Sequence, residues 1–170
     1  MDPVREAACA FVGAVTEAAG SLAEHVEQRL HRDSNWSEKP RVEILWTCLM
    51  YVLHLTDRVA FAHLSVETCD LFMSGILETL AATVGEGTLR NEYNTAQRRY
   101  SAFKKLLPEE GQGTTGTLCW EFAKAICFEN SEMNPAIIVS LSLRAADTFE
   151  ALDETFIQCV LKRIALEDKE

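Results

Sequence analysis

Residues 41–64 most constrain how this chain can fold, because they form a helix-length segment that is apolar on most of its sides. They read RVEILWTCLMYVLHLTDRVAFAHL. At about 100° per residue, five polar side chains fall within roughly 100° of one another and form one narrow seam. The seam residues are Glu43, Thr47, His54, Asp57 and Arg58. The remaining surface predicts a helix that is buried among other helices, and its residues include Leu45, Cys48, Leu49, Val52, Leu53, Val59 and Ala60.

Along most of the remaining chain, apolar residues recur at steps of three and four, which is the period of amphipathic helices. The first stripe consists of Val4, Ala8, Phe11, Val15, Ala19, Leu22, Val26 and Leu30. The last stripe consists of Ile138, Leu141, Ala145, Phe149, Leu152, Phe156, Cys159 and Ile164. The expected helices cover residues 3 to 30, 40 to 64, 66 to 84, 89 to 107, 118 to about 128 and 135 to about 164.

Start and stop signals bound these helices. Asp2 before Pro3, and Asn134 before Pro135, are N-cap residues followed by a proline that suits the first helical turn. Ser65 can cap the third helix in the same way. The other signals are Pro40 in the first turn of the second helix, Gly85 and Gly87 after the third helix, and Pro108 after the fourth.

No segment combines β-branched residues with period-two alternation, so the sequence predicts no sheet. A chain of 170 residues has the length of one ordinary domain, and no internal repeat or long linker divides it. We therefore expect an all-α fold: a single-domain helical bundle of about six helices over residues 1–170, with two long terminal helices. These two helices could lie side by side or pair with a second copy of the chain.

The charge balance is strongly acidic, with 26 Asp and Glu residues, 16 Lys and Arg residues and a formal net charge of -10. Affinity for nucleic acid comes largely from cations that neutralise phosphates, so this balance argues against broad nucleic-acid binding and against anionic membranes. The N-terminus lacks the basic region of a signal peptide. The longest apolar run, residues 44–53, is far short of about 20 residues. We expect a cytoplasmic protein without a membrane-spanning segment.

The six cysteines are scattered singly, without a CxxC pair or a Cys/His cluster of metal-binding spacing. We expect free, buried thiols. A carboxylate-bridged di-metal bundle needs Glu-x-x-His on two helices, and none of the four histidines has Glu three residues before it. The GxGxxG match at residues 111–116 lacks the preceding strand that dinucleotide binding requires. The sequence therefore indicates no metal and no cofactor.

His54 stands three residues before Asp57 and four before Arg58, so these side chains can meet on one face of a helix. A carboxylate beside an imidazole is a common way to orient a base. No nucleophile of the same helix lies within reach, so we assign no catalytic residue. Three interpretations of the seam stay open: a bonded network in the core, the lining of a ligand pocket, or a strip that faces water. Glu43 and Thr47 belong to the same set of candidates.

Positive charge is concentrated in the expected fourth helix. Its cations could form a solvated face, lie over acidic neighbours or bind an acidic partner. Because Glu92 is the one acid of this helix, the segment carries a net charge of +4, which leaves -14 for the rest of the chain. The strip consists of Arg90, Arg98, Arg99, Lys104 and Lys105.

Three short stretches carry a resemblance to known proteins. They are HLTDR at residues 54–58, NEYNTAQRRY at residues 91–100 and GTLCWEF at residues 116–122. These stretches are similar to segments of a group of bacterial all-helical proteins whose role is uncharacterised, and the likeness covers residues 42–126. The resemblance implies a bacterial cytoplasmic protein. It brings no activity, cofactor or substrate with it.

Strong helical periodicity, two long terminal helices and no catalytic constellation favour a non-enzymatic helical bundle. Such a protein acts through protein–protein contacts, either with a protein partner or as a homo-oligomer. The alternative is a small-ligand-binding or hydrolytic pocket lined by His54, Asp57 and Arg58. A cavity beside His54 would favour the pocket, and a fully bonded network would favour a structural role.

Overall fold

The computed structural model describes the chain except for residues 1, 31–37, 107–112, 114, 133 and 168–170. Every regular element within the described residues is a helix, which confirms the all-α, single-domain fold. The elements are α1 (Pro3–Leu30), α2 (Glu38–His63), α3 (Val66–Val84), α4 (Glu86–Tyr100), α5 (Leu118–Glu129), α6 (Pro135–Phe156), the π-helical turn η1 (Ile157–Leu161) and α7 (Lys162–Glu167).

The cap residues expected from the sequence begin three of these helices. Asp2 accepts a hydrogen bond from the backbone N–H two residues further on at 2.8 Å, and Asn134 does the same at 3.0 Å. The hydroxyl oxygen of Ser65 accepts the backbone N–H of Thr68 at 3.2 Å. These bonds satisfy donors that a first helical turn leaves without an intrahelical partner.

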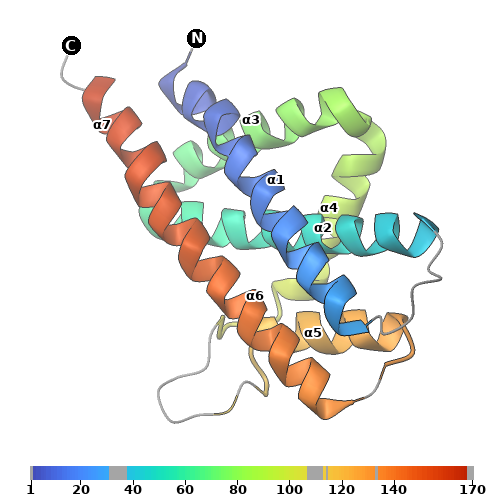
Figure 1. The fold of residues 1–170 in the computed structure, drawn as a ribbon. Coiled ribbons are helices and arrows are strands. Elements are labelled where there is room, and N and C mark those ends of the chain that lie inside the picture. The colour runs from blue at the N-terminus through green and yellow to red at the C-terminus, as the bar shows by residue number, and fades with distance from the viewer. Residues whose placement is uncertain (1, 31–37, 107–112, 114, 133, 168–170) are drawn as a thin grey trace.

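The two long terminal helices lie side by side. α1 runs antiparallel to the continuous helix formed by α6, η1 and α7, so both chain termini lie at the same end of the molecule (Figure 1). α1 also packs on α2 and α3, and α5 packs on α6. Of the two arrangements expected for the long helices, the chain thus adopts the intramolecular one.

The core forms where α1 meets α2, α3 and α6. The stripe of α1 is buried from Ala8 to Val26. The rings of Phe11, Phe72 and Phe156 join α1, α3 and α6, with centroids 5.3 to 5.9 Å apart. Gly75 of α3 permits a close approach to α1, because a Cβ added there would lie 2.9 Å from the Cβ of Ala8. The apolar stripe of α1 therefore finds its partners within the chain.

α2 is the core helix that its composition predicts. Residues 51–56 are all buried, whereas Leu45, expected on the buried side, is 46% exposed near the start of the helix. By length and composition Arg41–His63 could span a membrane, but 61% of its apolar window is buried inside the bundle. Neighbouring helices account for that apolar character. The absence of a membrane-spanning segment stays a prediction.

The fourth helix is shorter than its periodicity predicts. The expected span was 89–107, whereas α4 covers Glu86–Tyr100; position 107 lies outside the described residues. α4 starts early because Gly85, at a φ of 93°, both ends α3 and begins α4 as the single connecting residue. α4 ends early because an arginine of α2 binds backbone carbonyls at this point.

The last helix has the expected length but changes its register. The π-helical turn Ile157–Leu161 places one extra residue in the helical period. The buried stripe therefore continues on Val160, which is 1% exposed, and on the partly buried Ile164. Cys159, expected to face inward, is exposed, and so is Cys9. All six thiols are free, but the expectation that all six are buried was wrong.

Candidate functional site

Three of the five seam residues meet in a hydrogen-bonded network with two residues of α4. Arg58 Nε donates to His54 Nε2 at 3.0 Å, and His54 Nδ1 lies 2.7 Å from Gln97 Oε1. The amide nitrogen of Gln97 donates to Asp57 Oδ2 at 3.1 Å and to the hydroxyl oxygen of Tyr93 at 2.6 Å. His54 and Asp57 are thus joined through Gln97 and not directly.

The donors of this network determine the protonation state of His54. An arginine side chain offers only donors, so His54 Nε2 must accept the bond from Arg58 and carries no proton. The proton of the neutral ring therefore lies on Nδ1, which donates to Gln97 Oε1. That orientation leaves the Gln97 amide nitrogen to serve Asp57 and Tyr93. One neutral tautomer satisfies every bond.

Burial and charge support this assignment. His54 is 1% exposed. Burial is the main reason that its pKa falls to about 4; the hydrogen bond to Gln97 opposes this shift, and the charge of Arg58 adds to it. Burial also raises the pKa of the Asp57 carboxyl, an effect that Gln97 and Arg58 counteract and the nearby Asp70 increases. The imidazole is therefore neutral at pH 7.

Arg58 links the network to the backbone at the end of α4. Its Nη2 donates to the carbonyl oxygens of Tyr100 at 3.2 Å and Phe103 at 2.8 Å. The last carbonyls of a helix have no intrahelical partner, and cationic donors stabilise them. This contact explains why α4 ends at Tyr100, well before the proline that marks a stop in the sequence.

The network leaves little room for a ligand. The ring of His54 packs against Tyr100, with centroids 5.5 Å apart, and Tyr100 packs against Tyr51 at 5.6 Å. Neither the cavity between α1 and α6 nor the cleft between α2, α4 and α5 has His54, Asp57 or Arg58 in its lining. Both ring nitrogens of His54 are engaged, so the ring has no free lone pair to offer a substrate. The geometry favours the network interpretation of the seam.

The other two seam residues lie elsewhere. Glu43 is exposed near the start of α2. Thr47 lines a cleft of about 180 Å³ between α2, α4 and α5, together with Trp46, Arg99 and Glu129. Arg99 pairs with Glu129 at 3.3 Å. The structure therefore brings a seam residue and a strip residue together, which the sequence alone does not predict.

The basic strip does not lie on one helix face. α4 ends before the last two members of the strip, so the prediction of a continuous helical strip was wrong. The ion pair with Glu129 places part of the strip over an acidic neighbour, which is one of the three interpretations of the strip. The three arginines are exposed on α4 and the two exposed lysines follow it: Arg90, Arg98, Arg99, Lys104 and Lys105.

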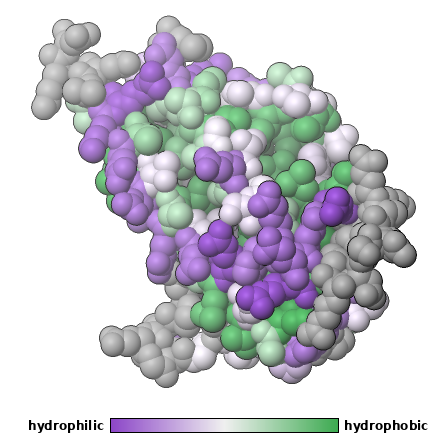
Figure 2. Space-filling view, in the orientation of Figure 1, coloured by the Kyte–Doolittle hydropathy of each residue, from purple (hydrophilic) through white to green (hydrophobic). Residues whose placement is uncertain are grey.

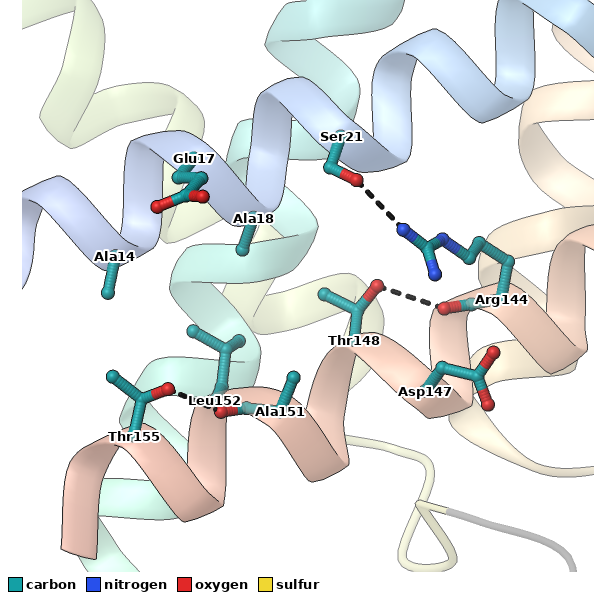
Figure 3. A pocket seen from close by; sticks show the side chains of 10 residues that line it. All are labelled: Ala14, Glu17, Ala18, Ser21, Arg144, Asp147, Thr148, Ala151, Leu152 and Thr155. Carbon is teal, nitrogen blue, oxygen red and sulfur yellow. Dashed lines mark hydrogen bonds between the residues drawn. The ribbon is translucent and has the colours of Figure 1, made fainter. Parts of the chain in front are cut away.

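A cavity of about 290 Å³ lies in the groove between α1 and α6. Figure 3 shows small residues and polar or charged ones lining it from both helices. The seam and the strip contribute nothing to the groove, so the sequence analysis missed it; the available signal was two alanines one turn apart, off the buried stripe. The lining consists of Ala14, Glu17, Ala18, Ser21, Arg144, Asp147, Thr148, Ala151, Leu152 and Thr155.

The charged groups of this groove form no ion pair with one another among the described residues. Arg144 Nη2 donates to the hydroxyl of Ser21 at 2.8 Å, while Arg144 Nε is buried without a hydrogen-bond partner. Within the described part of the chain, Glu17 and Asp147 make no hydrogen bond or ion pair. The pKa of the neighbouring His25 is lowered, mainly by burial and then by the charges of two arginines, one of which is Arg144. The groove thus holds charges of both signs.

The outer face of α1 beside the groove carries small residues among longer ones such as Glu17 and Glu24. Cys9, Ala10 and Gly13 are exposed, and Gly20 is half-buried. A Cβ added at Gly13 or Gly20 would meet nothing within 4 Å, although glycine inside a helix costs about 1 kcal/mol relative to alanine. Figure 2 shows hydrophilic residues over the second half of α1, whereas two large apolar side chains in the first half of α6, Val139 and Leu143, are 40% and 50% exposed.

Comparison of the chain with protein-family models, curated proteins and solved structures gave no match. The resemblance to bacterial helical proteins, the bacterial origin and the cytoplasmic location therefore stay predictions. Among the described residues, no group of three or more His, Cys, Asp or Glu side chains is arranged to hold a metal ion. Function has to be inferred from the network and the groove.

Proposed function

We propose that the protein is a non-enzymatic helical bundle that acts through self-association of the face formed by α1 and α6. The outer face of α1 carries this proposal. Gly13 and Gly20 leave open space there, and no packing contact among the described residues requires a glycine at either position. Small side chains reduce the distance at which a second helix can pack.

The size of this face suits a stable dimer. α1 contains 28 residues and is about 42 Å long at a rise of about 1.5 Å per residue. With neighbouring helices about 10 Å apart, the layer formed by α1 and α6 offers about 800 Å² per copy. Interfaces of standard size bury that area on each side.

The network around His54 supports the non-enzymatic part of the proposal. Its side chains bond to one another and to the end of α4, and they line neither the cavity between α1 and α6 nor the cleft beside Thr47. A ligand-binding or hydrolytic pocket at His54 would need an open lining and a free ring nitrogen. The bonded geometry therefore favours contacts with another protein surface over chemistry at this histidine.

Light scattering over a wide concentration range tests the proposal. The wild type is expected to approach twice the chain mass of 19.0 kDa. Gly13→Gln should weaken association at least about tenfold, since a long side chain keeps the facing helix at a distance. Asn94→Gln, at an exposed position of α4, should leave association unchanged. A wild type that stays monomeric at every concentration would overturn the proposal.

A further inference from the structure

We infer that the second copy docks on the groove between α1 and α6 about a two-fold axis, with Arg144 of each copy opposite Glu17 of the other. The inference rests on the proposed self-association and adds the identity of the facing groups and the relative direction of the helices. It follows from three features of the groove: where its charges lie, which of them have partners, and how a two-fold axis relates them.

The positive charge of the groove is held in a defined place. The bond from Arg144 Nη2 to Ser21 draws the guanidinium from α6 across to α1, at one end of the groove lining (Figure 3). Glu17 lies one turn before Ser21 on α1 and makes no ion pair within the described residues, with Arg144 or any other cation. The groove therefore presents a cation and an anion at neighbouring levels, each available to a facing surface.

A two-fold axis brings these charges together. Four residues, or about 6 Å along the helix, separate the levels of Glu17 and Ser21. A two-fold axis that lies in the interface, perpendicular to the helices and near Ala18, places the level of Glu17 in one copy opposite the level of Ser21 in the other. Each Arg144 guanidinium then meets the Glu17 carboxylate of the other copy, and both pairs form together. α1 then runs antiparallel to α1 of the second copy, and the four long helices form a bundle.

The charges of the groove also distinguish a second copy from other occupants. A basic partner would suit the net charge of -10 but would leave Arg144 without an anion. A partner whose contact surface carries only acidic groups would bind Arg144 but place like charges against Glu17 and Asp147, which is unfavourable. A second copy supplies one cation and one anion at the matching levels.

Charge exchange tests this pairing by sedimentation equilibrium of the purified full chain. Arg144→Glu and Glu17→Arg should each weaken the dimer at least about 30-fold, because each places two like-charge pairs in one interface. The double variant Arg144→Glu/Glu17→Arg restores opposite charges and should recover the wild-type dissociation constant within about threefold. Glu150→Arg makes the same charge change as Glu17→Arg at an exposed site outside the groove lining, and should leave the dimer intact.

The outcomes separate this inference from the proposed function. A wild type that dimerises while both single variants dimerise equally well would overturn the pairing and leave self-association in place on another register or face. Weakened single variants without recovery in the double variant would also overturn the pairing. A monomeric wild type would overturn both. Circular dichroism of each variant confirms that its helices are retained.

Discussion

The network between α2 and α4 and the groove between α1 and α6 each contain an arginine close to carboxylates, but they differ in how many of these groups find a partner. In the network, Arg58 binds His54 and two backbone carbonyls, and Gln97 links His54 to Asp57. In the groove, Arg144 makes one side-chain hydrogen bond among the described residues, to a serine, and its buried Nε has no partner there.

The bonds of the network stabilise the fold, whereas the groove holds polar groups that have few bonding partners. A buried donor or acceptor without a partner costs about 1–3 kcal/mol, so the core can hold a histidine and an arginine only when their bonds are made. Exposed charges lose little when they lack a partner. We therefore expect substitutions in the network to change folding, and substitutions in the groove to change association.

The largest effect is expected for His54→Ala. It removes a buried ring and leaves Arg58 Nε and Gln97 Oε1 without partners, so the free energy of unfolding should fall by about 4 kcal/mol. The matched substitution in the groove, Arg144→Ala, removes one bond to a serine together with a buried donor that has no partner, so it should cost under about 1 kcal/mol. Urea denaturation measures both. Equal losses of unfolding free energy in the two variants would contradict the expected difference between the network and the groove.

Acid should destabilise the fold through His54 by about 3 kcal/mol between pH 7 and pH 4. Its pKa is about 4 in the folded state against an ordinary 6.5. As pH falls, the unfolded chain therefore takes up this proton first, and stability is lost from about pH 6.5 down to about pH 4. The raised pKa of Asp57 acts in the opposite direction.

Denaturation of the wild type and His54→Gln at several pH values isolates the contribution of the histidine. The variant is less stable at pH 7 but should lose less stability on acidification, so the two curves converge toward pH 4. Parallel curves would show that His54 titrates alike in the folded and unfolded chain. That result would contradict the buried, neutral ring.

A smaller pair of effects compares the packed and open faces of α1. Gly75→Ala should lower the free energy of unfolding by about 2 kcal/mol, because its Cβ would lie 2.9 Å from Ala8 Cβ and force the helices apart. Gly13→Ala adds the same methyl group into open space and should raise stability by up to about 1 kcal/mol. Thermal unfolding at low protein concentration distinguishes the two. A Gly75→Ala variant as stable as the wild type would show that the space between α1 and α3 can accommodate a methyl group.

The smallest effect is expected for Glu17→Gln. Removal of a charge that has no partner within the described residues should change the free energy of unfolding of the monomer by less than about 0.5 kcal/mol. Chemical denaturation below the association range measures this value. A loss of unfolding free energy above about 1 kcal/mol would mean that Glu17 stabilises its own chain, which would contradict its assignment to a contact with a second copy.

Local features of the sequence were sufficient for much of the fold. The caps at Asp2, Ser65 and Asn134 and the three- and four-residue periods locate the helices, because these signals act over one or two turns. The same reasoning applies within the seam. His54 and Arg58, four residues apart on α2, do bond to each other.

Only the tertiary structure decided how the polar side chains are bonded, because their hydrogen-bond partners are distant in sequence. Gln97 lies 43 residues from His54 and accepts the hydrogen bond of the ring, while burial keeps the imidazole neutral. The contact of Arg58 with the carbonyl of Phe103 spans 45 residues and ends α4 where no residue type marks a stop. The groove arises only because α6 returns beside α1, with Arg144 bonded to Ser21 across 123 residues. Periodicity predicts which side of a helix is buried. Which other helix covers that side depends on how the whole chain packs.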